Sequence, residues 1–382
     1  MRRQVALIIE SSSSYGRDLL AGIVRFMRMH DTWSVFLEQR DLNRQPPSWL
    51  ADWHGDGIIS RATTPRLVEA VAKTGVPLVE LSDRRGGSLR PHVRSDDAAI
   101  SQLAAEHLLE RGFRRFAFCG FSGEAWSRRR QEAFVHAVGN AGGVCDVYNS
   151  PWLGPRGHSW DEQQRRLMMW LSQRVTPCGI MACNDVRGQH VLDACRKLTR
   201  AVPEELAVVG VDNDELLCRV CSPPLSSVIP NAAGVGFRAA ELLARLMDGQ
   251  PVDEQPQIIE PLGVATRQSS DVVAIDDRQI AAALHYIREH ACRGLSVEEV
   301  VQNCSVSRST LERQVRKYLG RTPQQEIRHV QIQRARELLL TTDLPAERLA
   351  ALCGFDHPEY LMVVFKRLTG MTTSQFRKQA KP

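Results

Sequence analysis

The sequence lacks the long apolar segments that cross a lipid bilayer. It is 43% hydrophobic and 24% charged, which is ordinary for a soluble globular protein, and no apolar run approaches the ~20 residues of a membrane-spanning helix. The opening MRRQVALIIESSS has a basic pair, but its apolar run VALII is only five residues long, shorter than the ~7–15 of a secretory signal. We interpret this run as a first buried strand. The sequence therefore predicts a cytoplasmic protein with no membrane partner.

Cysteine is present but lacks the spacing of a disulfide framework or a metal site. The ten cysteines are scattered along the chain, and without a signal segment we expect them to be reduced thiols. Cys218 and Cys221 form a single CxxC, with no second pair and no histidine at ligand spacing. We therefore expect no metal and no cofactor, and most of these cysteines should be small buried hydrophobic residues.

The signatures of common enzyme classes are also missing. The sequence has no nucleophile elbow, no P-loop, no GxGxxG after a strand and no HExxH. An enzyme remains the alternative to a binding protein, because α/β pockets with Asp, Arg and His also host catalysis. These absences weigh against it, and we expect no catalytic residues.

The chain is predicted to contain an α/β part followed by a helical tail. Strand-like runs alternate with amphipathic helical stretches over the first 270 residues, and this alternation predicts parallel sheets. Asp96 or Asp97 is suited to cap one of the helices, and Asn231 another. After Asp276 every periodic segment is helical. We predict an α/β unit over 1–270, a linker over 271–277 and an all-α unit over 278–382. The clearest strands are VALII, WSVFLE, DGIIS, VPLVEL, RRFAFCG, CGIMACN and ELAVVGVD.

The helical tail begins with a short helix, a tight turn and a second helix. Ser296 and Glu299 form a capping box for the first helix. Ser307 is a good N-cap for the second helix, in which Leu311 and Val315 face inward. This layout is typical of a helix-turn-helix motif that places a recognition helix in the DNA major groove. Its polar and basic outer face carries Arg308, Ser309, Glu312, Arg313 and Arg316.

The same pattern recurs after a connecting helix. Thr322 and Gln325 begin that helix, which should run to about Leu340 and be about 27 Å long. A short helix over 344–353 follows, Gly354 ends it, and Asp356 with Glu359 is predicted to cap the next helix. That helix should bury Leu361, Val364, Phe365 and Leu368 and expose His357, Glu359, Tyr360, Val363, Lys366 and Arg367. Two such motifs can reach neighbouring major-groove segments, about 34 Å apart.

The distribution of charge supports a nucleic-acid partner for the tail. The segment 276–382 has 17 Lys and Arg and 12 Asp and Glu, so the whole formal net charge of +5 lies there. A modestly basic unit that carries two recognition helices favours double-stranded DNA over a merely solvated surface.

The tail resembles the DNA-binding domain of AraC/XylS-type regulators. The resemblance rests on SVSRSTLERQVRKYLGRTPQQEIRHVQIQRARELL and AALCGFDHPEYLMVVFKRLTGMTTSQFRKQ, and it implies that residues after each turn meet base edges. Arg313 then suits guanine, Glu312 suits cytosine, and Val363 is able to touch a thymine methyl group. Arg316 and Lys366 suit phosphates, or are solvated charges on a helix face. The positions assigned to DNA are Arg308, Ser309, Glu312, Arg313, Arg316, His357, Glu359, Tyr360, Val363 and Lys366.

The first 270 residues resemble the effector domain of LacI/GalR-type repressors, which is similar to sugar-binding periplasmic proteins. The resemblance rests on VRSDDAAISQLAAEHLLERGFRRFAFCG, SRRRQEAF, GIMACNDVRG, VPEELAVVGVDND, PPLSSV and AAGVGFRAAELLARLMDG. No helix-turn-helix precedes VALIIE, where that family has its own, so DNA binding is expected to lie in the tail. The resemblance implies two α/β lobes of a periplasmic-binding-protein-like fold, with a ligand between them at the ends of strands.

Polar side chains at the ends of strands are the candidates for binding this ligand. Polyhydroxylated ligands need paired acceptors and donors, an arginine fork and an aromatic platform. The resemblance points most firmly to Arg130 and Asp212. Asn184 and Asp185 have an alternative role as helix caps, and Trp126 as a packing residue between lobes. The candidates are Ser13, Tyr15, Arg61, Trp126, Arg130, Asn184, Asp185, Asp212 and Asn213.

These observations predict a sugar-responsive, DNA-binding transcription regulator, an activator of an operon for the use of a pentose or a related sugar; the alternative is a regulator that responds to an acidic or non-sugar small molecule. We expect a homodimer that binds a double-stranded operator and, if it is an activator, contacts RNA polymerase. Arg61 departs from the acidic residue that relatives with this pair of domains tend to have, and a cation there leaves room for an acidic or otherwise altered ligand. The other alternative is a ligand-independent architectural DNA-binding protein, which needs no pocket.

Overall fold

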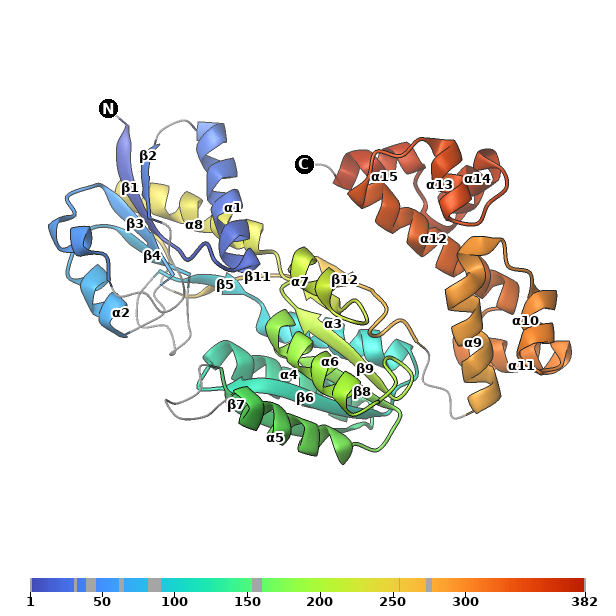
Figure 1. Ribbon diagram of the computed structural model, residues 1–382. Helices are drawn as coiled ribbons and strands as arrows, with labels where there is room; N and C mark the ends of the chain where they lie inside the picture. The colour runs from blue at the N-terminus through green and yellow to red at the C-terminus, as the bar shows by residue number, and fades with distance from the viewer. Residues whose placement is uncertain are drawn as a thin grey trace. The chain divides into compact units, whose positions relative to one another are not determined.

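The chain folds into two compact units, Met1–Asp271 and Val272–Pro382 (Figure 1). The computed structural model describes residues 2–30, 33–38, 46–61, 65–81, 91–152, 160–253, 255–272 and 277–380. Most of the predicted linker, residues 273–276, lies outside these ranges. The ten cysteines are free thiols and seven of them are buried, as expected for small hydrophobic residues. None of the helices in the described part of the chain is long and apolar enough to cross a membrane.

The first lobe of the larger unit is built on a parallel sheet in the order β2-β1-β3-β4. The strands are β1 (Arg3–Ile8), β2 (Trp33–Leu37), β3 (Gly57–Ser60) and β4 (Leu78–Glu80). Its helices are η1 (Ser48–Asp52), α2 (Pro65–Ala72), α1 (Ser14–His30) and α8 (Ala232–Met247), and the last comes from much later in the chain (Figure 1).

Two glycines let α1 and α8 pack backbone against backbone. A Cβ on Gly22 would lie 1.9 Å from the carbonyl oxygen of Ala233, and one on Gly236 would lie 2.0 Å from that of Leu19. Any side chain at either position would separate the helices. These close contacts hold α8 against α1 and thus against the first lobe.

The second lobe is built on a six-stranded sheet in the order β12-β10-β9-β8-β6-β7, parallel except for β12. The central strands β8 (Cys178–Ala182) and β9 (Leu206–Val211) are fully buried, because helices cover both faces. The other strands are β6 (Arg115–Ser122), β7 (Val144–Pro151), β10 (Ser226–Ile229) and β12 (Gly263–Ala265). The helices are α3 (Asp97–Glu110), α4 (Ala125–Asn140), α5 (Trp160–Ser172), α6 (Asp185–Lys197) and α7 (Glu215–Val220).

The chain passes between the lobes three times. One crossing runs through β5 (Val93–Ser95), which leads from β4 to α3. The second leads from β10 to α8, and the third returns through β11 (Gln257–Ile259), which pairs in parallel with β5. Two lobes joined by such short strands form a cleft lined by both, and the carboxyl ends of the parallel strands open towards it. The seven strand-like runs named from the sequence are all strands, whereas β5, β7, β10, β11 and β12 were not foreseen.

All the regular secondary structure in the described part of the smaller unit is helical. Its elements are α9 (Arg278–His290), η2 (Ala291–Arg293), α10 (Val297–Asn303), α11 (Arg308–Leu319), α12 (Pro323–Thr341), α13 (Ala346–Leu352), α14 (Pro358–Thr369) and α15 (Thr373–Ala380). The helix pairs α10–α11 and α13–α14 are the two helix-turn-helix motifs, and α12 connects them (Figure 1).

The capping pattern of this unit matches the sequence prediction except at α14. The capping boxes at Ser296 and Thr322 are both formed, and Ser307 caps α11. The prediction for Asp356 is wrong, because His357 is the N-cap of α14, without a side-chain hydrogen bond, and Pro358 follows it at N1. Proline preorganises the first turn and has no N–H that needs a cap. Leu368, predicted to be buried, is 52% exposed near the end of α14.

Candidate effector pocket and nucleic-acid interface

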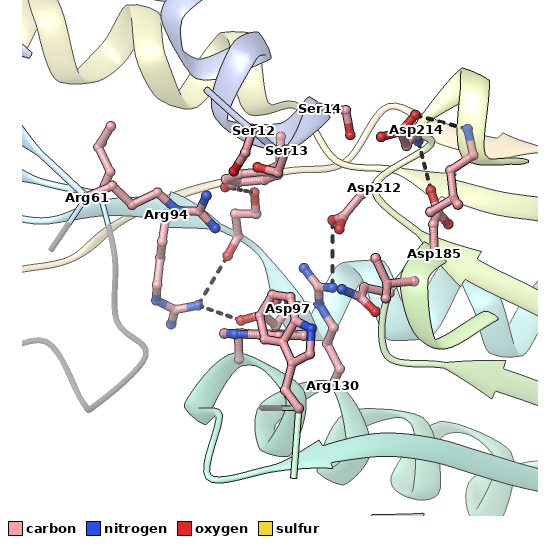
Figure 2. A pocket seen from close by; sticks show the side chains of 18 of the residues that line it. Ser12, Ser13, Ser14, Arg61, Arg94, Asp97, Arg130, Asp185, Asp212 and Asp214 are labelled. Atoms are coloured by element: carbon pink, nitrogen blue, oxygen red, sulfur yellow. Dashed lines mark hydrogen bonds and ion pairs between the residues drawn. The ribbon is translucent and has the colours of Figure 1, made fainter. Parts of the chain in front are cut away.

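A cavity of about 290 Å³ lies within the larger unit, at the ends of strands from both lobes (Figure 2). Of the nine side chains that the sequence predicts to bind a ligand, only Asn213 does not line it. The lining residues are Ser12, Ser13, Ser14, Tyr15, Arg61, Leu81, Arg94, Ser95, Asp97, Trp126, Arg129, Arg130, Trp152, Asn184, Asp185, Val186, Asp212, Asp214 and Leu217. No group of three metal-ligating side chains occurs within the described ranges.

The wall from the first lobe is organised around Glu10, a buried carboxylate just after β1. Its Oε1 oxygen accepts a hydrogen bond of 2.8 Å from Ser13 Oγ and forms an ion pair with Arg61. The Arg61 guanidinium also lies 4.7 Å from the centre of the Tyr15 ring. Arg61 therefore lines the cavity as one half of an ion pair, held against an aromatic face.

Tyr15 connects this wall to the crossing strand β5. Its hydroxyl lies 2.8 Å from Ser95 Oγ, and the pKa of Tyr15 is raised because the phenol is buried. The phenol is therefore neutral at physiological pH and available as a hydrogen-bonding group.

The opposite wall is organised around Asp97, the first residue of α3, which is 3% exposed. Its Oδ1 oxygen accepts from Nε of Arg130 at 2.9 Å, and its Oδ2 oxygen accepts from Nε and Nη2 of Arg129 at 2.9 and 2.7 Å. Arg94 Nη1 lies 3.8 Å from Oδ2. One buried carboxylate thus holds three guanidinium groups that line the cavity.

Arg130 joins this cluster to the far end of the cavity. Its Nη1 atom donates 2.6 Å to the carbonyl oxygen of Cys183 and lies 4.0 Å from Oδ1 of Asp212. Figure 2 shows Arg130 and Asp212 facing one another across the pocket. The guanidinium also lies 5.0 Å from the centre of the Trp126 ring, so an arginine fork and an aromatic surface are combined.

Two tryptophans add to the aromatic part of the lining, beside Tyr15. The rings of Trp126 and Trp152 have centres 5.7 Å apart and are nearly perpendicular, at 81°. Trp126 Nε1 donates 3.1 Å to Glu124. Trp126 therefore lines the cavity, and its ring and hydrogen-bond partners Trp152, Glu124 and Arg130 belong to the second lobe.

Asn184 and Asp185 follow β8 and differ in role. Asn184 caps α6, because its side chain accepts a hydrogen bond from the amide of Arg187. Asp185 is 1% exposed and accepts from Ser227 Oγ at 2.6 Å and from the amide of Asp214 at 2.8 Å. Burial, with the nearby Asp212 charge, raises the pKa of Asp185 to about 8.

Asp212 and Asn213 follow β9 with positive φ angles of 108° and 51°. This conformation is rare outside glycine and is often found at functional sites. It directs Asp212 into the cavity, where burial raises the pKa of its carboxyl to about 6. Asn213 is directed elsewhere, and its Oδ1 oxygen accepts 2.8 Å from Nη2 of Arg267. The structure thus does not support the predicted ligand contact of Asn213.

Several lining residues were not foreseen from the sequence. Asp97 was considered only as a possible helix cap, whereas Asp96 has that role. The signal that was available is the run Arg128–Arg130 in α4, because consecutive arginines close to a buried position require a carboxylate partner. The position of Arg94 and Ser95 depends on β5, which is too short to recognise from sequence.

The predicted DNA-contacting face of α11 is exposed. It consists of Arg308, Ser309, Glu312, Arg313 and Arg316. Arg308 forms ion pairs with Glu298 of α10 and, at 3.4 Å, with Glu312. Within the described residues Arg313 has no such carboxylate partner. Arg308 is thus held in ion pairs, whereas Arg313 and Arg316 form none with the residues that the structure describes.

The corresponding face of α14 has a different character. His357, Glu359, Tyr360, Val363 and Lys366 are all exposed. Val363 is 62% exposed, and the Tyr360 ring lies 5.0 Å from the guanidinium of Arg328 in α12. This face therefore offers one cation, one acid and apolar surface.

Family models match three consecutive parts of the chain. A XylR N-terminal domain matches residues 4–94, a periplasmic binding protein-like domain matches residues 105–270, and a helix-turn-helix domain matches residues 300–379. The family models agree with the predicted fold class, a two-lobed periplasmic-binding-protein-like domain followed by a helical DNA-binding domain.

Relatives match over the whole length. The xylose operon regulatory protein of Escherichia coli K12 is 32% identical over 98% of this chain and 97% of its own. The protein of the same name from Haemophilus influenzae is 32% identical over 98% of each chain. A solved structure described as the xylose-binding transcription activator xylR superimposes with a TM-score of 0.72 at 31% identity and covers 100% of this chain and 99% of its own.

Proposed function

The chain belongs to the family of xylose operon regulatory proteins, and from this premise we propose that its pocket binds a neutral pentose such as xylose. The protein is a sugar-responsive transcription regulator with a DNA-binding tail. We propose further that it acts in the cytoplasm as a homodimeric activator, binds a double-stranded operator and contacts RNA polymerase. The pocket would then serve as a sensor, without catalysis.

The observation that carries the choice of a neutral ligand is the pairing of charges around the cavity. Arg61 is matched by Glu10, and Arg129 and Arg130 share Asp97, with Asp212 as a second carboxylate 4.0 Å from Arg130. The cation at position 61, which on sequence alone leaves room for an acidic ligand, is therefore already compensated. A carboxylate ligand would compete with Glu10 and Asp97 for these arginines and would also approach Asp212, which disfavours a sugar acid.

The remaining lining suits the two kinds of surface on a sugar. Asp212 offers oxygen acceptors, the arginines and the Asn184 amide offer N–H donors, and the Tyr15 hydroxyl does both. The Trp126 and Trp152 rings offer an apolar surface for the C–H face. This lining also argues against a ligand-independent architectural role, because such a protein needs no polar cavity.

Binding would favour a closed arrangement of the two lobes, because Tyr15 and Arg61 come from one lobe and Arg130 and Asp212 from the other. A ligand shifts such an equilibrium only by its difference in affinity for the open and closed states. Contacts to both lobes at once supply that difference. The output would be a change in how two DNA-binding tails of a dimer engage the operator.

A calorimetric and thermal-shift screen of the full chain tests the proposal. We expect D-xylose to bind and to raise the melting temperature of the larger unit, and D-xylonate, which is xylose oxidised to a carboxylate, to bind at least about tenfold more weakly. Binding of D-xylonate in preference to D-xylose would overturn the neutral-ligand assignment. The absence of binding by any pentose, hexose or sugar acid would overturn the sensor function itself.

A further inference from the structure

The two helix-turn-helix motifs have separate hydrophobic cores. The first core includes Leu311 and Val315 of α11 and Ile327 of α12, and the second includes Ile332 of α12 and Val364 of α14. Each motif is therefore stabilised by its own apolar contacts, and α12 contributes to both. The two clusters share no residue, so the orientation of α14 relative to α11 depends on α12 and on contacts between the two motifs.

Gln331 lies between these two cores on α12 and is 1% exposed. Its Nε2 atom donates hydrogen bonds to two backbone carbonyl oxygens, that of Ala291 at 2.8 Å and that of Gly354 at 3.1 Å. Ala291 begins η2 beside the first motif, whereas Gly354 is in the turn of the second motif. A single buried amide thus joins the backbones of the two halves.

The backbones meet closely at this point. Gly354 has a φ of +73°, and a Cβ there would lie 2.7 Å from the carbonyl carbon of Cys292 and 2.8 Å from the oxygen of Ala291. The turn of the second motif is consequently in direct contact with η2, and only glycine fits there. Gln331 bonds to both sides of this contact.

The oxygen of the Gln331 amide is connected to α14 through Arg328. Its Oε1 oxygen accepts 2.7 Å from Nη1 of Arg328, whose guanidinium lies 5.1 Å from the centre of the Phe355 ring and 5.0 Å from that of Tyr360. Tyr360 is on the face of α14 assigned to DNA. A continuous series of contacts therefore runs from η2 through Gln331 and Arg328 to that face.

We propose that Gln331 is a positioning residue that fixes α14 relative to α11 and so sets the spacing between the two DNA segments that the tail binds. The proposal rests on the DNA-binding function of the tail and adds the residue that determines its geometry. Two linked binding modules gain affinity from each other only when their separation matches that of their sites. A tail held rigidly at one spacing discriminates strongly against other spacings, and a loosened tail does not.

The test compares two identical substitutions on the same helix of the full chain. Gln331→Met keeps the length of the side chain but removes the donors to both carbonyls and the acceptor for Arg328. Gln333→Met is the matched control, because Gln333 is exposed. The DNA probe is a duplex selected from a random pool by the unchanged chain, together with versions that have one or five base pairs inserted between the half-sites and a version with the first half-site alone.

We expect the unchanged chain and Gln333→Met to lose about tenfold or more in affinity when base pairs are inserted. Gln331→Met should bind the selected duplex about tenfold more weakly than the unchanged chain does. Its affinity for the single half-site should stay within about threefold of that of the unchanged chain, and its affinities for the different spacings should differ by less than about threefold. Retained half-site binding shows that the first motif is folded. Full spacing discrimination by Gln331→Met would overturn the proposal.

A second variant covers the case in which Gln331→Met does not fold. Gln331→Asn remains polar but is one methylene shorter and cannot span both carbonyls, so it should also weaken spacing discrimination. Unaltered discrimination by Gln331→Asn would contradict the inference. If the unchanged chain selects a duplex but tolerates every spacing, the inference fails while DNA binding stands. If it selects no sequence at all, the DNA-binding function fails too.

Discussion

Arg130 donates a hydrogen bond of 2.9 Å from Nε to the Oδ1 oxygen of Asp97, and both side chains are almost completely buried. This contact joins α4 to the first turn of α3, where Arg129 occupies the other carboxylate oxygen. The arginine fork of the pocket therefore depends on an acid that immediately follows the crossing strand β5. Its removal would take away the carboxylate that three guanidinium groups share.

We predict that Asp97→Ala lowers the free energy of unfolding of the larger unit by about 3–5 kcal/mol, because it removes the hydrogen-bonded carboxylate partner of the buried Arg130. Chemical denaturation of the full chain, followed through the transition of that unit, measures the change. Asp193→Ala is the control, since Asp193 pairs with exposed Arg196 and Lys197 and should cost at most about 1 kcal/mol. Equal losses for the two variants would contradict the central role of Asp97.

Asp212→Ala is predicted to abolish the rise in melting temperature on addition of D-xylose, because it removes the carboxylate that faces Arg130 across the cavity. Basal affinity for DNA should stay near that of the unchanged chain, since the DNA-binding surfaces are in the other unit. Thermal-shift and DNA-binding measurements on the same preparation check both expectations. An undiminished thermal shift would remove Asp212 from the site.

The buried Asp185 carboxyl predicts a pH dependence of stability. Its pKa is raised from 3.8 to about 8 by burial, so its stabilising contribution is fully present below about pH 4 and is lost as pH rises through 8. Over that interval it should reduce the free energy of unfolding by about 1.4 kcal/mol per pH unit. Urea denaturation between pH 5 and 8 should show that Asp185→Asn gains stability relative to the unchanged chain as pH rises. A constant difference would mean that Asp185 is ionised throughout.

Arg313 and Lys366 are predicted to contribute to DNA binding in different ways. Arg313→Ala should cost about 1–3 kcal/mol on the selected duplex and relax the preference at one base pair, because an arginine in the groove binds guanine through two bonds. Lys366→Ala should weaken binding to all sequences alike and reduce the salt dependence, as expected for a phosphate contact. Competition assays with selected and random duplexes separate the two. Equal losses on both duplexes for Arg313→Ala would exclude its role in base recognition.

Local features of the tail were determined by the sequence alone. The capping boxes at Ser296 and Thr322 and the cap at Ser307 form as predicted because each depends on residues within one helical turn. The strands of the α/β part were recognised for a related reason, since fully buried strands such as β8 and β9 are continuous apolar runs. Where the local signal was ambiguous, as between Asp356 and the dipeptide His357-Pro358, the prediction was wrong.

Only part of the pocket lining could be predicted from the sequence. Side chains at the ends of recognisable strands, such as Arg61 and Asp212, were named correctly as lining positions because parallel strands end at one edge of a sheet. Whether their charges are paired with others in the folded chain could not be predicted. Whether Arg61 is a free cation depends on Glu10, which is 51 positions away in sequence and meets it only through the pairing of β1 with β3.

The sequence by itself determined the order of elements, the two kinds of unit and the residue types available to bind sugar and DNA, because these depend on periodicity, caps and composition. Only the tertiary structure decided which charges are compensated, that Asn213 is directed to Arg267 and away from the cavity, and that Gln331 joins the two motifs. Each of these depends on partners that are 23 to 54 residues apart in the sequence or on a backbone in the left-handed region. Ion pairing and hydrogen bonding act over a few ångströms in space, and the folded chain alone determines which groups come that close.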